Sequence, residues 1–322
     1  MVAGMANSKE KSSAAKVTKQ NRVHSFLVRI TVACFSIPGI FSSIACDEKT
    51  NIPGQKQTTT FSTSLKPVVE TENGSLSGRV SWAGPIPTVE GFSGPISPLS
   101  EHASKPRLAW PNPNAPKINP DNKGIENAVV YLDTREHFTS SNANFPPVEV
   151  ETNHFKMQVN QGGVSSPVGF ILLGEGVDFV NKQDFFFTIR ARGDAFFSIP
   201  LSNKNKPVRK VFTKPGLVTL TTGSGQFWMR SHLFVLNTPH AARCDKDGRF
   251  EINDIPTGKH DFKVWIPSWK VMEKEIDAET WEITRLEFTP SPTKKFSTFI
   301  KPGSNSSDQI TSFELSDLQS QK

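Results

Sequence analysis

The residues of this 322-residue sequence that could hold a zinc or copper ion include its seven histidines. A zinc or copper site needs several nitrogen or sulfur donors that converge on one point, and no two of these histidines have the spacing of a metal-binding motif. A cluster of His154, His232 and His240 is the alternative that would give a metal site if the fold brought these three together.

The sequence around Cys244, Asp245 and Asp247 does not favour a catalytic or calcium-binding role for these residues. Cys244 has no histidine and acid at the spacing of a catalytic triad, so we interpret it as a turn residue rather than a nucleophile. Asp245 and Asp247 lie in an Asp-Lys-Asp-Gly segment that could ligate calcium, but the loop lacks oxygens at its fifth and twelfth positions. We therefore expect a tight turn at 245–248.

The elements that would position these residues are β-strands. Residues 218–235 alternate apolar and polar side chains and break at 223–225, a pattern typical of half-buried strands. Residues 249–252 and 261–265 are predicted to pair across a turn at 256–258. Further predicted strands cover 75–81, 126–133, 185–192, 195–201, 270–276 and 282–288, and 170–181 reads as a hairpin. With 24 prolines, 21 glycines and few helical runs, the sequence predicts an all-β fold.

Three segments do not show the alternation of a strand. Residues 47–73 are rich in threonine, serine, glutamine and lysine, which predicts a disordered linker. Residues 85–120 carry nine prolines and are predicted to form a long loop without interior strands. The polar segment 303–322 is predicted to be a disordered tail.

The positive charge of the chain is concentrated at its beginning. The net charge is +6 with an isoelectric point near 9.2, yet the first 45 residues hold six basic residues and one acidic residue. Only one excess positive charge remains for the rest of the chain, where the basic residues do not cluster. This distribution argues against nucleic acid as a partner.

The beginning of the chain resembles a secretory leader. A basic segment is followed by residues 30–45, which carry no charge, and by Ser-Ser-Ile-Ala-Cys ending at Cys46. We expect residues 1–46 to direct export to the periplasm or cell envelope. Ile44-Ala45-Cys46 resembles a lipoprotein signal, so Cys46 is a lipidation candidate and a lipid anchor is one expected outcome. Ordinary cleavage or a retained anchor are the alternatives.

Three motifs carry a resemblance to known families. Gly74-x-Leu-x-Gly-x-Val, Asn127-Ala-Val-Val-Tyr-Leu and Asp247-Gly-x-Phe-x-Ile are similar to the carboxypeptidase regulatory-like β-sandwich, and the interval between them resembles a cupredoxin. Together they resemble planctomycete-type extracytoplasmic proteins in which a cupredoxin-like domain interrupts such a sandwich. The resemblance implies two Greek-key-type β-sandwiches, one formed by 74–140 plus 239–302 and one by 141–238.

An interrupted sandwich requires that strands from its two halves lie side by side. The strand at 75–81 has no neighbouring hairpin partner, and the strand after Asp247-Gly248 would leave an unpaired edge. We therefore expect Leu76 to Val80 to lie close to Phe250 and Val264.

The resemblance also implies where copper ligands would be. A type 1 copper site uses two histidines, a cysteine and a weak methionine. Met229 occupies the methionine position, but Gln226, Gly223 and Phe187 occupy the positions of the three strong ligands. We therefore expect no cofactor. Phe187 is expected to fill the former metal pocket, and the missing side chain of Gly223 is expected to compensate for the larger volume of the phenylalanine. The Gln226 amide is expected to reach solvent or to hydrogen-bond to the loop backbone.

The leading functional hypothesis is a non-enzymatic extracytoplasmic binding or scaffold protein, whose partner is an unknown protein or glycan of the cell envelope. A first alternative is a carbohydrate or cell-envelope attachment module, which would present an exposed platform of Trp82, Trp110, Trp265 or Trp269. A second alternative is an accessory role in copper electron transfer. Burial of the tryptophans discriminates between the first two hypotheses.

Overall fold

Strands dominate the part of the chain that the computed structural model describes, which comprises residues 73–95, 107–135, 144–223, 225–279, 281–303 and 305–318. The predicted leader, Cys46 and the predicted linker up to residue 72 lie outside these residues. The all-β prediction is confirmed, since the described elements are strands apart from one short 3-10 helix, η1 (Leu315–Leu318). Within the described ranges, no helix is long and apolar enough to cross a membrane.

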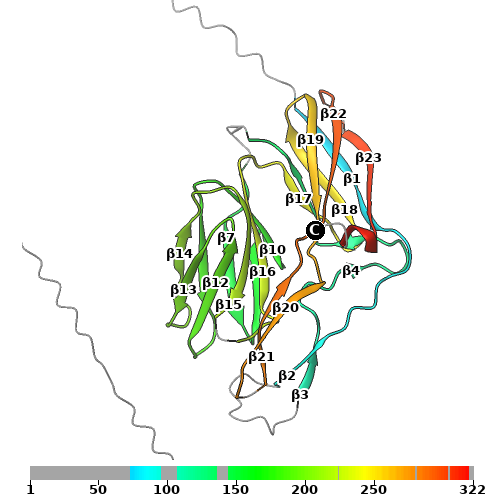
Figure 1. The fold of residues 1–322 in the computed structure, drawn as a ribbon. Coiled ribbons are helices and arrows are strands. Elements are labelled where there is room, and N and C mark those ends of the chain that lie inside the picture. Colours follow the sequence, from blue (N-terminus) through cyan, green and yellow to red (C-terminus); the bar gives the residue numbers. More distant parts are fainter. Residues whose placement is uncertain are drawn as a thin grey trace, which may run out of the picture. The chain divides into compact units, whose positions relative to one another are not determined.

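The first sandwich combines segments that are far apart in the sequence (Figure 1). One of its sheets has the order β18-β1-β23, formed by Arg249–Ile255, Gly74–Trp82 and Asn305–Phe313. The other has the order β17-β6-β19-β22, formed by Ala241–Arg243, Val129–Leu132, Gly258–Trp265 and Thr293–Ile300. Early and late parts of the chain therefore build one core.

The second sandwich is formed by the part of the chain between these early and late segments. One sheet has the order β10-β16-β15-β12-β13, formed by Val168–Leu172, Arg230–Leu236, Gly216–Thr222, Phe187–Gly193 and Phe197–Leu201. The other has the order β14-β11-β7-β8-β9, formed by Val208–Val211, Gly176–Asn181, Val148–Asn153, Lys156–Gln161 and Val164–Ser166. Three small pairs complete the fold: β2 (Phe92–Pro95) with β3 (Arg107–Trp110), β4 (Lys117–Ile118) with β5 (Ile125–Glu126), and β20 (Val271–Ile276) with β21 (Ile283–Phe288).

The expected proximity of the first and late strands is confirmed. β1 runs antiparallel to β18, with Leu76 opposite Ile252. Val80, Phe250 and Val264 belong to the same buried cluster. The physical cause is the alternation of β1, whose apolar side chains all face one side and need a sheet that covers them.

Two predicted hairpins are wrong. The strands of 170–181 do not pair with each other, because β10 pairs with β16 and β11 pairs with β7 and β14. Likewise β18 pairs with β1, whereas β19 pairs with β6 and β22. A short turn between two alternating strands can join neighbours in one sheet, or it can lead the chain to the opposite sheet of a sandwich. The apolar face of the second strand is buried in both cases, so the sequence pattern is the same.

The predicted disordered tail is also wrong in its described part. β23 runs parallel to β1 over nearly its whole length, and Phe313 is fully buried in the first core. The tail is polar because β23 is an edge strand, and a single aromatic residue anchors it. The proline-rich segment, predicted to be a long loop without interior strands, contributes the short strands β2, β3 and β4. These strands pair only in two-stranded ladders, which have no interior strand and tolerate neighbouring prolines.

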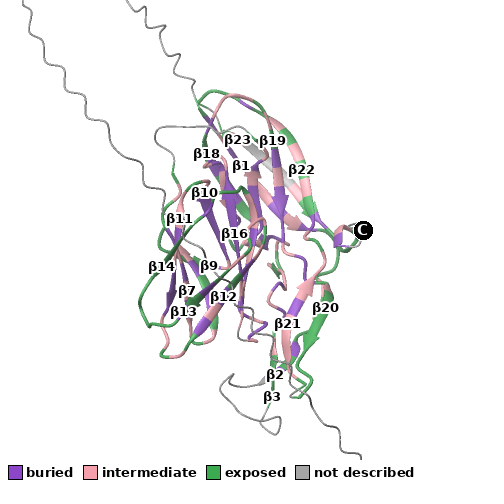
Figure 2. Ribbon diagram, turned by 60° about the vertical axis from the view of Figure 1, so that its left-hand side comes forward, coloured by how far each residue is buried: buried purple, intermediate pink, exposed green. Residues whose placement is uncertain are grey.

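The two sandwiches share a third buried cluster. β10 and β16 of the second sandwich contribute Val168, Phe170, Phe234 and Leu236, which pack against Val129 and Trp265 of the first. Phe234 and Trp265 meet edge to face at a centroid distance of 5.1 Å. Figure 2 shows that β10 and β16 are largely buried, whereas β20 is mostly exposed.

Candidate functional site

The positions that the resemblance assigns to copper ligands lie at one end of the second sandwich, where β12 begins and β15 is joined to β16. Phe187 is fully buried, and its ring lies 4.8 Å from that of Phe185 and 6.2 Å from that of Phe155. Met229 is buried in the same cluster. Aromatic and thioether side chains therefore occupy this end of the core, and none of them is a strong copper ligand.

The expected compensation of volume between Phe187 and Gly223 is wrong. A Cβ atom added to Gly223 would lie 2.9 Å from Arg190 Nε and 3.2 Å from Thr188 Cβ. Thr188 and Arg190 point to the face of β12 opposite to Phe187, because side chains alternate along a strand. Phe155 and Phe185 fill the space beside Phe187 instead.

Gln226 and Cys244 are both buried. The Gln226 side chain does not reach solvent, since the residue is 7% exposed, and the backbone carbonyl of Gln226 accepts a hydrogen bond from the Thr222 hydroxyl at 3.3 Å. Cys244 is the free cysteine of the described residues, and it is buried in the core of the first sandwich. Burial raises the pKa of its thiol, so it is not a thiolate at neutral pH, and it belongs to a different buried cluster from Met229.

The loop that precedes β16 is covered by aromatic side chains from other segments. Trp228 stacks on Trp110 with a centroid distance of 4.1 Å and an interplanar angle of 4°. Phe227 meets Phe92 edge to face at 5.6 Å, and Leu286 of β21 joins the same cluster. The proline-rich segment and the β20–β21 hairpin therefore cap the end of the second sandwich, where a cupredoxin-type site would need access for an electron-transfer partner.

The four tryptophans that the attachment hypothesis would present as an exposed platform do not form one. Trp82, Trp265 and Trp269 are buried, with 3, 3 and 9% exposure. Trp110 is partly buried in its stack on Trp228. The rings of Trp82 and Trp269 pack on each other at a centroid distance of 5.5 Å in the first core, where each indole buries a large apolar area.

The structure does not bring His154, His232 and His240 together. Among the described residues, no group of three histidine, cysteine or acidic side chains is arranged to hold a metal ion. His232 lies under Trp265 and is within 3.3 Å of the Thr219 hydroxyl; its burial, with the nearby Arg230 charge, lowers its pKa to about 3. His154 is exposed in the turn between β7 and β8, and burial lowers the pKa of His240.

The predicted tight turn at 245–248 is confirmed. The Asp245 carboxylate accepts hydrogen bonds from the backbone N–H groups of Asp247 and Arg249, both at 2.8 Å. The Asp247 carboxylate accepts from the side-chain amides of Asn119 and Asn122. Gly248 is required here because it has a φ of 76° and an added Cβ would lie 2.2 Å from the Val80 carbonyl oxygen.

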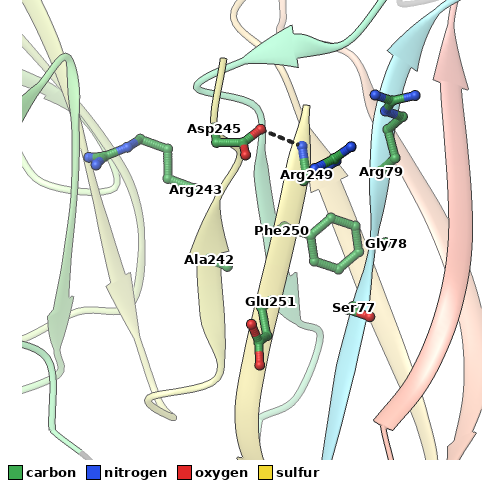
Figure 3. Close-up of a pocket in the computed structure, with 9 residues that line it drawn as sticks. All are labelled: Ser77, Gly78, Arg79, Ala242, Arg243, Asp245, Arg249, Phe250 and Glu251. Carbon is green, nitrogen blue, oxygen red and sulfur yellow. Dashed lines mark hydrogen bonds between the residues drawn. The ribbon is translucent and has the colours of Figure 1, made fainter. Parts of the chain in front are cut away.

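A wide groove of about 640 Å³ runs along β18, the edge strand of the first sandwich (Figure 3). It is lined from β1, β17, β18 and the 245–248 turn by Ser77, Gly78, Arg79, Ala242, Arg243, Asp245, Arg249, Phe250 and Glu251. Figure 3 shows Arg243 pointing away from β18, and its guanidinium donates to the Val168 carbonyl of the second sandwich at 3.3 Å. Arg79 and Arg249 are the other two cations that line the groove.

Arg79 and Arg249 are directly opposite each other on β1 and β18. The N–H and carbonyl of Arg249 both bond to Asp245 rather than to β1, so the pair occupies a non-hydrogen-bonded site, where cross-strand side chains approach most closely. Arg79 Nε donates to the Asp247 carbonyl at 3.1 Å. Like charges at such a site repel, but Glu251 and Asp245 nearby give the groove both signs of charge.

Sequence reasoning missed these arginines because it weighed basic residues only by whether they cluster along the chain. The signal that could have found them is the alternation of the strands, which places every second residue of 249–253 on the outside. Which outward residues face one another depends on the pairing of β18 with β1, which are 167 or more residues apart in the chain, and no local pattern gives that register.

Comparisons with known proteins give a similarity of fold over part of the chain. No family model and no curated protein matches it. Similar solved structures include a Cu-containing nitrite reductase from Thermus scotoductus SA-01, with 22% identity, a TM-score of 0.24, and coverage of 28% of this chain and 22% of that one. A purple cupredoxin from Nitrosopumilus maritimus shows 17% identity and a TM-score of 0.23, with coverage of 28% and 99%. Amicyanin from Paracoccus versutus shows 18% identity and a TM-score of 0.24, with coverage of 33% and 97%.

This chain therefore spans about a fifth of the nitrite reductase and nearly all of the two smaller proteins. The similarity is to cupredoxins and covers at most a third of this chain in these matches. At such TM-scores it carries no conclusion about what this chain binds, and no match supports the regulatory-like part of the resemblance.

Proposed function

We propose that this chain is a non-enzymatic binding or scaffold protein that acts outside the cytoplasm, and that its second sandwich does not use copper. The proposal rests on one observation above others. Phe187, Phe155, Phe185 and Met229 pack together at the position where a cupredoxin-type site would gather its donors. Such a core has neither the imidazoles nor the thiolate that hold type 1 copper.

The aromatic cap on the same end supports the proposal. The stack of Trp110 on Trp228 and the contact of Phe92 with Phe227 cover the loop before β16. Trp228 also donates from its indole N–H to the Phe155 carbonyl at 2.9 Å, which fixes the loop against the β7–β8 turn. An electron-transfer protein needs an accessible path to its metal, whereas a scaffold gains rigidity from this packing.

Export is the second part of the proposal, and it rests on the uncharged segment that ends at Cys46. Mass spectrometry of protein isolated from its native cells should find an N-terminus at or near Cys46. A soluble cytoplasmic protein that starts at Met1 would contradict export.

The absence of a copper function is tested by metal analysis of the same isolated protein. We expect far less than one copper ion per chain, because the buried core offers no donor set. Stoichiometric copper that survives gel filtration would overturn this part of the proposal. The envelope-attachment alternative is not favoured in its predicted form, since three of its four tryptophans are buried.

A further inference from the structure

Arginine and threonine side chains form rows across the outer face of the second sandwich. β15 pairs with β12 on one side and with β16 on the other, so that Arg190, Thr221 and Arg230 lie side by side on three neighbouring strands. Arg192, Thr219 and His232 form the next row. The first row places two guanidinium groups on either side of a hydroxyl group.

These side chains point away from the core. Along β12, Phe187, Ile189 and Ala191 are buried in the second sandwich, and the intervening arginines are on the other face. On β16 the same alternation sends Leu233 and Val235 into the core and Arg230 outward. The arginines therefore belong to one surface.

The β20–β21 hairpin covers this surface and turns it into a cleft. Arg230 donates from Nη1 to the Leu286 carbonyl at 3.3 Å, and its guanidinium lies 4.7 Å from the centre of the Phe288 ring. Two adjoining cavities of about 160 and 520 Å³ lie between the sheet and the hairpin, and both are lined by Arg192, Thr221 and Arg285. The larger one also extends to Gly223 and Gly225.

The acidic residues of the cleft are mostly engaged with a single cation. Arg285 hydrogen-bonds to both Glu275 and Glu287. In the described part of the chain, neither Arg190 nor Arg192 forms an ion pair; Arg192 instead lies 5.5 Å from the Phe196 ring. Arg190 and Arg192 thus remain for a ligand beside the partly engaged Arg230, and Asp277 also lines the larger cavity.

Arg230 is the cation of the sheet whose guanidinium the hairpin partly encloses. Its Nε atom is inaccessible to solvent and has no hydrogen-bond partner among the described residues. Burial lowers the pKa of this guanidinium to about 10, so it still carries its charge at neutral pH. An anion in the smaller cavity, which Arg230 lines, would offset the cost of holding this charge partly out of water.

Gly223 shapes the wall of the cleft. An added Cβ at this position would lie 2.9 Å from Arg190 Nε, so a side chain here would displace that guanidinium. The position at which the copper resemblance calls for cysteine is therefore the position that leaves room for Arg190.

We propose that this cleft binds a phosphate or sulfate group, held by Arg190, Arg192 and Arg230 together with the Thr219 and Thr221 hydroxyls. Planar guanidinium groups bind such oxyanions through paired hydrogen bonds, and hydroxyl groups add further donors. Arg190 and Arg192 are two residues apart on a strand, or about 7 Å, so two neighbouring anionic groups can be bound at once. This inference rests on the proposed binding function and names the chemical class of its ligand.

The groove along β18 is not proposed as a site for this ligand. It also holds opposed arginines, Arg79 and Arg249, but it is wide and includes Asp245 and Glu251. Its arginines therefore provide matched control positions on another strand pair.

The test is isothermal titration calorimetry of the full chain with inorganic phosphate and with pyrophosphate. We expect saturable binding, with pyrophosphate bound more tightly than phosphate. The double variant Arg190→Gln/Arg192→Gln should weaken pyrophosphate binding by about tenfold or more, since it removes several charge-assisted hydrogen bonds. The control Arg79→Gln/Arg249→Gln removes the same charge and should leave the affinity unchanged.

A sulfated oligosaccharide in a parallel titration distinguishes the source of the anionic group. Binding of pyrophosphate alone indicates a small free anion, whereas binding of both, each weakened by the Arg190 and Arg192 changes, indicates an ester on a larger molecule. Circular dichroism and the melting temperature establish that the variants fold. The absence of saturable binding of any probe, or an equal loss in the control variant, would overturn the proposal without bearing on copper.

Discussion

Phe187 gives the sharpest prediction about the core of the second sandwich. The side chain is fully buried and packs against the rings of Phe155 and Phe185. Replacing a buried phenylalanine by alanine costs about 3 to 5 kcal/mol, because the transfer free energy is lost and a cavity remains. The two aromatic contacts contribute about 0.5 to 1.5 kcal/mol each to that loss. We therefore expect Phe187→Ala to lower the free energy of unfolding by about 4 kcal/mol.

Urea denaturation followed by tryptophan fluorescence measures this loss, and the chain offers a matched control. Phe186 is the adjacent residue and is 56% exposed, so Phe186→Ala should change the free energy of unfolding by less than about 0.5 kcal/mol. Phe187→Leu should give an intermediate loss of about 1 to 2 kcal/mol. If Phe187→Ala cost less than about 1 kcal/mol, or no more than Phe186→Ala, the aromatic core described here would be refuted.

The strand β23, the buried His232 and the stack of Trp110 on Trp228 give three more predictions. Truncation after Gly303 removes β23 and Phe313, so it should lower the melting temperature and expose the edge of β1; an unchanged melting temperature would contradict that pairing. Acidification should destabilise the protein through His232, whose pKa of about 3 in the folded state is below the value near 6.5 of the unfolded chain. The unfolded state then binds the proton first, so stability present above pH 6.5 is lost as the pH falls toward 3, by up to about 1.4 kcal/mol per pH unit. Urea titrations at several pH values should show that His232→Phe reduces this slope and that His154→Phe, at an exposed position, does not. Trp110→Ala should expose Trp228 and shift its fluorescence to longer wavelength, whereas an unshifted spectrum would argue against the stack.

The fold class could be predicted from the sequence because the strands alternate clearly, and the pairing of β1 with β18 followed from two strands that each lacked a partner. The hairpins at 170–181 and at 249–265 could not be assigned in the same way. Both turns join strands of opposite sheets, and a sequence pattern shows which face of a strand is apolar but not which sheet covers it. β23 was missed for a related reason, since an edge strand has few apolar residues.

The candidate site was predictable only where residues were adjacent in the sequence. The turn at 245–248 followed from its aspartates and glycine. The burial of the tryptophans and the direction of Gly223 depended on tertiary packing, which overrides the tendency of indoles to mark binding surfaces. The row of Arg190, Thr221 and Arg230 depends on the register of three strands and has no local signal.

Titration of the purified full chain with copper(II), followed by visible absorption, tests most directly the proposal that this sandwich carries no copper centre. Phe187, Gly223 and Gln226 supply neither thiolate nor imidazole, and the described thiol, Cys244, is buried in the first core. The proposal predicts no intense blue band at any ratio of copper to protein, because that band requires a thiolate bound to the metal. An intense blue band at one copper per chain, abolished by Met229→Leu, would contradict it.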